Sequence, residues 1–453
     1  MKLSSDSDIK LDSVPGPDGI PAILLKRCAT SLSIPIHLLW SESLSTGIVP
    51  NFYKTGFITP LFKKGSRREA SNYRPVTLTS HVVKVYERVV RKHMVDYLET
   101  NNLLTDKQHG FRSNRSCLTQ MLDHFDDIFE GFTRGEDTDS IYLDYAKAFD
   151  KVDLDLLVLK LKRYGFGDQL VDWIQAFLSD REQVVVLNGV HSDIAKVLSG
   201  VPQGTVLGPL LFILFINDLD QIVTSSTVSF FADDTRVSEQ IGCYEDCALL
   251  QDDLYRILDW SRSNNMKLNE QKFELLNHLH NSKSSLSELP FVGETLLYKV
   301  SSEEILYPVE NVRDLGVQVS NDLSWSGHIG SMVTKARSTL SWVFSVFKTR
   351  DGTVMTTLYK SLVRSTLEYC CPLWNPGKVT DIQLIEGVQR TFTSRISGLQ
   401  HLNYWERLAR LKLMSLQRRR ERYIILMMWK ILHNIVPNCC HIEFKMTCQD
   451  MAL

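Results

Sequence analysis

The chain has 453 residues, and its 51 Lys and Arg residues nearly balance its 53 Asp and Glu residues, which gives a formal net charge of −2. Hydrophobic residues make up 43% and charged residues 23% of the chain, as in ordinary globular proteins. This composition excludes an intrinsically disordered chain, a collagen-like repeat, a small disulfide-stapled domain and a uniformly basic nucleic-acid coat. The length predicts two to four domains or one large multi-lobed unit.

The apolar runs and the cysteines restrict the cellular setting. The longest apolar runs have seven residues each, at 210–216 and 423–429, whereas a membrane span needs roughly 18. The N-terminal segment has no hydrophobic stretch of the kind found in a secretory signal, so we expect a protein that is neither secreted nor membrane-bound. Nine cysteines without a C-x-x-C pair favour reduced thiols. The group Cys439, Cys440, His441 and Cys448 is a weak zinc candidate, because its spacing matches no common zinc module.

The first third of the chain alternates turn signals with helical and extended patterns. A Pro- and Gly-rich entry at 14–22 is followed by apolar residues at helical spacing, and a short extended run ends in a basic loop at 63–68. The predicted helices cover 24–39, 79–98 and 117–132, and the predicted strand covers 56–62.

The middle of the chain mixes strands with helices, and the last third is predominantly helical from about residue 331 to 433. The predicted strands are 140–143, 183–187, 227–232 and 235–238, the predicted helices are 154–164, 207–219 and 249–260, and 280–288 is predicted as a flexible loop. This order predicts an α+β fold with a helical C-terminal region.

Three carboxylates stand at predicted strand ends. Asp144 follows the apolar run SIYL, and Asp233 and Asp234 separate two predicted strands of one hairpin. Carboxylates held side by side repel one another, and a divalent cation relieves that repulsion. Mg²⁺ prefers hard oxygen ligands, and two such ions can support an in-line displacement at phosphorus. The alternative is that Asp-Asp merely caps a surface turn.

The segments around these aspartates carry a family resemblance. The motifs SIYLDYAKAFDKVD, SGVPQGTVLGPLLFILFINDL, FFADDT and LDWSRSNNMKLNEQK occur in this order, and they are accompanied by GPDGIPAILLK, ITPLFKKG, NYRPVTL, QHGFRSNRSC, VRDLGVQVSNDLSW, STLEYCCPLWNP and SLQRRRERY. Together they resemble the reverse transcriptase of non-LTR retrotransposons and are most similar to jockey-like elements. The resemblance runs from residue 16 to about residue 440.

The resemblance implies a right-hand polymerase. In this arrangement an N-terminal tail occupies 1–13, the fingers 14–139, the palm with the catalytic core 140–318, and a helical thumb-like region 319–453. The palm is expected to be an antiparallel sheet backed by helices, with Asp144 and the Asp233-Asp234 turn meeting on one face.

The resemblance also implies roles for single residues of the acidic centre. Asp144 and Asp233 match the metal-binding aspartates of the palm, and Asp234 matches their neighbour, so all three are catalytic and metal-ligand candidates. Lys272 matches the lysine that protonates the leaving pyrophosphate, although a lone lysine is more often a solvated surface charge.

Further candidates surround the incoming nucleotide and the primer. Lys63 and Arg74 match basic residues that hold the triphosphate, with Lys64 as an alternative to Lys63, and cationic side chains suit that task. Phe149 matches the ring that would clash with a 2′-OH, or it is a core aromatic. Gln203 and Gly204 match residues that contact the incoming nucleotide and its templating base. The missing Cβ of Gly204 would let a base pair approach closely, or the segment is only a turn before a helix. Leu315 and Gly316 match the hairpin that supports the primer end.

The function implied is RNA-directed DNA synthesis by a two-metal mechanism, with an RNA template, a DNA primer and dNTPs as partners. The implied cofactor is a pair of Mg²⁺ ions, with Mn²⁺ as a substitute. A nuclear location is expected from the family, with a cytoplasmic one as the alternative, and the oligomeric state stays open. We expect the chain to be a fragment that lacks an upstream endonuclease domain.

Other classes fit the sequence less well. The chain has neither the phosphate-binding G-x-x-x-x-G-K-[ST] of P-loop proteins nor the G-x-S-x-G of hydrolases. A maturase-like enzyme is disfavoured by the C-terminal motifs. The main rival is a catalytically inactive, RNA-binding relic, although the three aspartates and Gln203 are intact. Residues 63–92 hold nine Lys and Arg against two Glu, and 407–430 hold eight against one. These basic segments suit phosphate backbones, or they are solvated helix faces.

Overall fold

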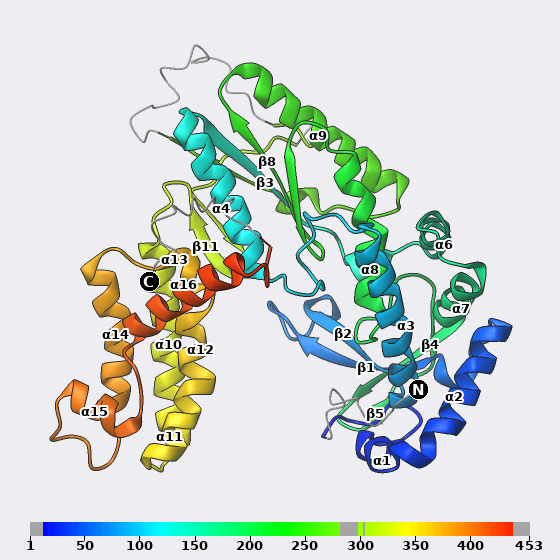
Figure 1. The fold of residues 1–453 in the computed structure, drawn as a ribbon, viewed down its shortest axis with the longest axis horizontal. Coiled ribbons are helices and arrows are strands. Elements are labelled where there is room, and N and C mark those ends of the chain that lie inside the picture. The colour runs from blue at the N-terminus through cyan, green and yellow to red at the C-terminus, as the bar shows by residue number, and fades with distance from the viewer. Residues whose placement is uncertain (1–11, 281–297, 302–303, 438–453) are drawn as a thin grey trace, which may run out of the picture.

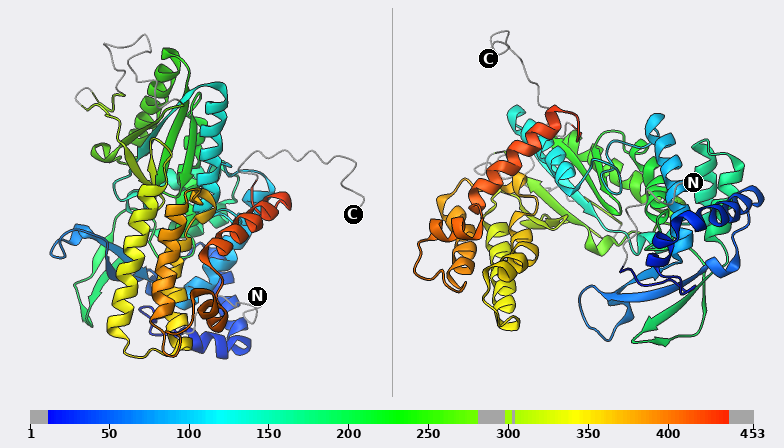
Figure 2. Two further views of the ribbon diagram at one scale, coloured as in Figure 1. Left: turned by 90° about the vertical axis from the view of Figure 1, so that its left-hand side faces the viewer. Right: turned by 60° about the horizontal axis from the view of Figure 1, so that its bottom comes forward.

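The computed structural model describes residues 12–280, 298–301 and 304–437. Two sheets, a hairpin and a C-terminal group of helices form an open arrangement in which the N-terminal sheet and the C-terminal helices lie at opposite ends (Figures 1 and 2). The central sheet lies between them, so the molecule mixes helix and sheet as the sequence predicts. No helix within the described residues is long and apolar enough to cross a membrane.

The N-terminal sheet joins segments that are far apart in sequence. Strand β1 pairs antiparallel with β2 on one side and parallel with β4 on the other, although β1 and β4 are more than 100 residues apart. The strands are β1 Thr55–Phe62, β2 Tyr73–Leu78, β4 Arg181–Leu187, β5 Val190–His191 and β6 Ala195–Val197. Helices α1 Ala22–Arg27, α2 Ala29–Thr46, α3 His81–Thr100, α6 Leu154–Arg163 and α7 Asp168–Leu178 also belong to this half of the chain.

The central sheet is antiparallel throughout and has the strand order β7-β8-β3-β9. Its strands are β3 Asp137–Leu143, β7 Thr227–Phe231, β8 Asp234–Ile241 and β9 Glu274–His278. Helix α4 Cys117–Arg134 contacts β3 and β7, and α9 Tyr244–Ser263 contacts β8. Helix α8 Gly208–Ile216 is apolar on all sides and almost wholly buried, as expected for a helix in the middle of a core.

The C-terminal region is a separate group of helices connected to the central sheet by a hairpin of β10 Asn311–Asp314 and β11 Val317–Ser320. The helices are α10 Ser326–Val346, α11 Gly352–Leu358, α12 Ser365–Glu368, α13 Cys371–Trp374, α14 Val379–Ser394, α15 Tyr404–Leu411 and α16 Leu416–Leu432, with a π-helical turn at Tyr359–Arg364. Their apolar core also includes Phe125 of α4 and Leu276 of β9. The helices are therefore packed against the sheet rather than linked only through the chain.

The local predictions agree with many of these elements. Local patterns did not predict helix α7 or strands β2, β5, β6, β9, β10 and β11. The helix predicted at 24–39 is two helices, α1 and α2, and Asp234 already belongs to β8 rather than to the turn. The predicted loop at 280–288, apart from its first residue, and the zinc candidate at 439–448 lie outside the described residues.

Candidate active site

The antiparallel sheet brings the three aspartates to one edge. Strand β3 ends at Leu143, which pairs with Thr235 near the start of β8. Asp144 directly follows Leu143 in the sequence. Phe231 pairs with Asp234, so Ala232 and Asp233 form the turn between β7 and β8. The end of β3 and the β7–β8 turn therefore lie side by side.

A polar side chain from outside the sheet holds this turn. Ala232 has φ +58°, a left-handed backbone that residues with a Cβ rarely adopt. The Oε1 atom of Gln108 accepts hydrogen bonds from the backbone N–H of Ala232 at 3.0 Å and of Gly110 at 2.7 Å. The N–H of His109 also donates to the carbonyl of Phe230 at 2.9 Å. Gln108 is 2% exposed, so these bonds are shielded from water.

Burial and mutual repulsion raise the pKa of both aspartates in the turn. For Asp233 burial is the largest cause and the charge of Asp144 adds to it, whereas Arg74 and Lys63 oppose the rise of the pKa. Asp234 is solvent-exposed at the start of β8, yet its place in a concave site limits its hydration. That loss of hydration, followed by the charge of Asp233, raises the pKa of Asp234 to about 6. The turn therefore favours added positive charge.

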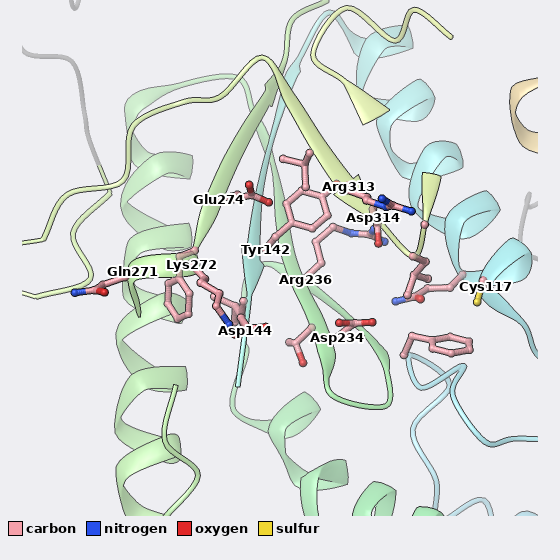
Figure 3. A pocket seen from close by; sticks show the side chains of 18 of the residues that line it. Cys117, Tyr142, Asp144, Asp234, Arg236, Gln271, Lys272, Glu274, Arg313 and Asp314 are labelled. Carbon is pink, nitrogen blue, oxygen red and sulfur yellow. Dashed lines mark hydrogen bonds and ion pairs between the residues drawn. The ribbon is translucent and has the colours of Figure 1, made fainter. Parts of the chain in front are cut away.

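Lys272 supplies one such charge. Its Nζ lies 2.7 Å from Oδ2 of Asp144, with the two side chains 55% and 39% exposed (Figure 3). An ion pair this well solvated contributes little to stability, about 0–1 kcal/mol. The segment before Lys272 is fixed by its backbone, because the N–H of Asn269 donates to the carbonyl of Asp144 at 2.7 Å. Lys272 thus covers one carboxylate oxygen at the sheet edge.

Asp144 and Asp234 open onto a cavity of about 880 Å³. One face of the central sheet forms its floor, and the β10–β11 hairpin forms another side (Figure 3). The lining includes Lys64, Tyr142, Asp144, Asp234, Arg236, Lys272, Glu274, Asp314, Leu315 and Gly316. Within the described residues, no three Asp, Glu, His or Cys side chains form a group that could hold a metal ion by themselves.

Lys63 and Arg74 flank the turn of the β1–β2 hairpin. Leu61 pairs with Arg74, and the N–H of Lys63 donates to the carbonyl of Asn72 at 2.8 Å. Both cationic side chains are exposed. Their positive charges oppose the rise in the pKa of Asp233.

The loop with Gln203 and Gly204 is fastened to strand β2. The N–H of Thr77 donates to the carbonyl of Gln203 at 2.7 Å, and Nε2 of Gln203 donates to Oδ1 of Asp150 at 2.9 Å. Gly204 has φ +112°, and a Cβ there would lie 2.4 Å from the carbonyl oxygen of Thr77. The glycine is therefore required by the protein's own backbone, and the close approach of a base pair stays a prediction.

A buried carboxylate holds the other end of this loop. Oε2 of Glu87 accepts hydrogen bonds from the N–H groups of Val206 at 2.7 Å and Leu207 at 2.9 Å, immediately before α8. Burial raises the pKa of Glu87, and these two bonds oppose the rise. Glu87 therefore fixes where the loop joins the core.

Phe149 has the surroundings of a core aromatic. It lies in the short helix α5 Ala148–Lys151, stacks on Phe212 with ring centroids 4.2 Å apart, and meets Phe111 edge-on at 6.2 Å. Its ring is only partly buried, because it packs at the margin of the main core.

Leu315 and Gly316 form the turn of the β10–β11 hairpin. Both have positive φ, +45° and +88°, and both line the cavity that contains Asp144 and Asp234. The hydroxyl of Tyr369 donates to the carbonyl of Leu315 at 2.7 Å, which ties the turn to the C-terminal helices.

Two supporting residues were not assigned from the sequence. Gln108 belongs to the quoted motif QHGFRSNRSC, but no role was attached to it. Glu87 lies within the apolar stripe of α3, among the buried residues Val83 and Val90. A charged residue in such a stripe requires a buried partner, and that was the available signal.

Carboxylates at the ends of adjoining strands, with cationic side chains around the same cavity, are an arrangement suited to phosphoryl or nucleotidyl transfer. The family described as "Reverse transcriptase (RNA-dependent DNA polymerase)" matches residues 62–319, which is more than half of the chain. The chain belongs to the reverse transcriptase family.

Curated relatives from Drosophila melanogaster agree with this assignment. The chain is 27% identical over 399 residues to the probable RNA-directed DNA polymerase from transposon X-element, and the match covers 86% of this chain and 42% of that protein. It is 24% identical over 402 residues to the RNA-directed DNA polymerase from mobile element jockey, covering 86% and 43%. The chain thus spans less than half the length of these relatives, and the predicted similarity to jockey-like elements is confirmed.

Among solved structures, apo telomerase from Candida tropicalis aligns with 89% of this chain and 66% of its own chain, at 11% identity and a TM-score of 0.45.

Proposed function

We propose that the chain is the polymerase part of a non-LTR retrotransposon protein and extends a primer 3′-OH with dNTPs on an RNA template. The observation that carries this proposal is the meeting of Asp144 with the Asp233-Asp234 turn at one edge of the central sheet. These residues lie within the segment that matches the reverse transcriptase family.

The acidic edge fits a hard divalent cation. Its donors are carboxylate oxygens, and their repulsion, together with burial, raises the pKa of Asp233 and Asp234. Mg²⁺ typically takes one or two carboxylates and completes its coordination with water and substrate phosphates, so a complete protein cage is not required. We propose that Asp144 and Asp233, with Asp234 beside them, hold two Mg²⁺ ions, for which Mn²⁺ can substitute. When bound, the metal would activate the attacking hydroxyl and stabilise the leaving oxygen.

The remaining residues would position the reactants. In the proposed reaction the primer 3′-OH attacks the α-phosphate of a deoxynucleotide and pyrophosphate leaves. Lys63, with Lys64 as the alternative, and Arg74 would pair with the triphosphate, and Lys272 would give a proton to the leaving pyrophosphate. Such chemistry depends mainly on alignment and charge neutralisation.

Three residues would set selectivity. Phe149 would exclude a 2′-OH, and its stack on Phe212 would keep the ring rigid. Gln203 and Gly204 would face the incoming nucleotide and its templating base. In the present structure the side-chain amide of Gln203 bonds to Asp150, so nucleotide binding would have to exchange that bond.

The lobes would then have the roles of a right-hand polymerase. We propose fingers at 14–139, a palm at 140–318 and a thumb-like region from 319 onward. The parallel pairing of β1 with β4 would add residues 181–187 to the fingers sheet. Leu315 and Gly316 would support the primer end. A nuclear site of action is expected on the family basis.

Primer extension on an RNA template with Mg²⁺ tests the proposal. Wild type should incorporate dNTPs, and Asp144→Ala and Asp144→Asn should not, with melting temperatures close to that of wild type because Asp144 is partly exposed. Asp259→Asn is the matched control, since its side chain lies on the surface of α9 in an ion pair with Arg262. No incorporation by wild type, or equal incorporation by Asp144→Ala, would contradict the proposal and leave an inactive RNA-binding relic as the better description.

A further inference from the structure

A buried arginine follows the acidic turn along β8. Arg236 is two residues after Asp234, so the two side chains point to the same face of the strand. Its cross-strand partners are Tyr142 on β3 and Ser229 on β7. Arg236 is only 3% exposed, although arginine is almost never buried unless it is paired.

The partner of Arg236 comes from the hairpin. Nη1 of Arg236 donates to Oδ2 of Asp314, and Nη2 donates to Oγ of Ser229 at 3.0 Å. The guanidinium carbon lies 5.8 Å from the ring centre of Tyr142. The side chain of Asp314 is 8% exposed, so this is a buried ion pair. Figure 3 shows Arg236 reaching along the floor of the cavity toward Asp314.

The ion pair connects the two parts of the site that act on the primer in the proposed reaction. Asp314 is the last residue of β10 and directly precedes the turn at Leu315 and Gly316. Arg236 belongs to the strand that begins with Asp234. The same hairpin is bonded to the C-terminal helices by Tyr369 and to β9 by the N–H of Val309 on the carbonyl of Leu275. The ion pair adds a direct link from the hairpin to the strand of the aspartates.

Stability alone does not account for such a pair. Replacing a buried ion pair by apolar residues of similar volume is often neutral or stabilising, whereas removing one partner is strongly destabilising. What the pair provides beyond stability is direction, because the planar guanidinium has hydrogen bonds to two strands at fixed angles. Here those bonds join β10 of the hairpin to β7 and β8 of the central sheet.

We propose that Arg236 and Asp314 are positioning residues that set the Leu315-Gly316 turn against the Asp233-Asp234 turn and so align the primer terminus with the carboxylates. This inference rests on the proposed polymerase function. Both residues line the cavity that contains Asp144 and Asp234, and the role proposed for them is exerted through the hairpin.

The experiment compares Asp314→Asn, Arg236→Lys and the double variant Arg236→Met/Asp314→Leu in primer extension, with kcat and KM measured separately for dNTP and for primer–template. Glu368→Gln is the matched control, because Glu368 forms a similar partly buried pair with Arg419 among the C-terminal helices. Melting temperature and amide hydrogen exchange at 311–320 are measured on all proteins.

Misalignment of the primer end should lower kcat of Asp314→Asn by about tenfold or more and raise KM for primer–template, with KM for dNTP unchanged. Arg236→Lys should lose less kcat than Asp314→Asn, because lysine keeps the positive charge beside Asp314. The double variant should have a higher melting temperature than Asp314→Asn but a kcat that is no higher. Amide hydrogen exchange in the hairpin should be faster in Asp314→Asn than in wild type. Glu368→Gln should keep the kcat of wild type.

A double variant with wild-type kcat, or an Asp314→Asn variant with the same kcat as Glu368→Gln, would overturn the inference. Unchanged hydrogen exchange at 311–320 in Asp314→Asn would overturn it whatever the activity. Wild type without activity would instead overturn the proposed function, so the two failures are distinguishable.

Discussion

Replacing Gln108 by leucine tests how the acidic turn is held. The substitution removes the acceptor of two buried N–H groups, on Ala232 and Gly110, and each unpaired group costs about 1–3 kcal/mol. It also removes the amide nitrogen of Gln108, which is itself buried without a partner among the described residues, and this offsets part of the loss. We expect a net loss of about 1–3 kcal/mol in the free energy of unfolding.

The loss of activity should be larger than the loss of stability suggests. Without the bond to Gln108, the left-handed backbone of Ala232, which costs about 1–2 kcal/mol for a residue with a Cβ, loses a hydrogen bond that compensates for it. The turn should then populate other conformations that displace Asp233. Ala232→Gly removes that cost, so in the Gln108→Leu background it should restore primer extension by about fivefold to thirtyfold.

Urea denaturation and primer extension on the four proteins of this cycle measure both effects. Gln389→Leu is the matched control, because Gln389 is also fully buried but bonds Tyr404 and Met414 in the C-terminal core. If Gln108→Leu loses no more activity than Gln389→Leu at equal folded fraction, or if Ala232→Gly restores nothing, Gln108 does not hold the turn.

Three further substitutions follow from the geometry of the site and its core. Gly204→Ala should lower the melting temperature and weaken dNTP binding. The new Cβ would meet the carbonyl oxygen of Thr77, and the positive φ would cost about 1–3 kcal/mol. Gly377→Ala, which has open space around its Cβ position, should change neither the melting temperature nor dNTP binding. Burial lowers the pKa of His278 to about 4. Between pH 6.5 and 4 the unfolded chain therefore binds a proton that the native protein excludes, and the free energy of unfolding falls with pH by up to about 3 kcal/mol. His278→Gln should make the melting temperature fall less steeply with pH, and an unchanged slope would contradict this. Asp233 has a raised pKa, so its ionised form opposes folding above the pKa of the unfolded carboxyl; without metal at pH 7, Asp233→Asn should melt at the same temperature or higher, and a large decrease would indicate a structural carboxylate.

The strands that carry the aspartates were predictable because their signals are local. The apolar runs before Asp144 and before Asp233 are short, β-compatible and end at acidic residues, so strand ends and turn could be assigned within a residue or two. Strand β2 was not predicted, and it contains Pro75, a residue that a central strand does not tolerate. In the structure Pro75 pairs with Pro60, and β2 is an edge strand of its sheet, which is where proline is tolerated.

The surroundings of the nucleotide loop were not predictable from local patterns. The bond from Thr77 to Gln203 exists because β2 lies beside the loop at 201–207, and that placement depends on the pairing of β1 with β4 across more than 100 residues. No periodicity in either segment encodes that pairing. For this reason the sequence alone did not reveal that the carbonyl of Thr77 also requires a glycine at 204.

Buried polar residues offer a route from sequence to these distant contacts. Glu87 lies in the apolar stripe of α3, and a buried carboxylate must find hydrogen-bond donors. The donors most in need of partners in a fold are the N–H groups at helix starts, which have no acceptor within their own helix. Glu87 does accept from the two residues before α8, and Gln108 and Asp314 likewise bind a turn and a buried arginine. A buried polar residue can therefore indicate that an irregular segment is held there, and in this chain Glu87 and Gln108 hold two segments that carry or adjoin candidate site residues.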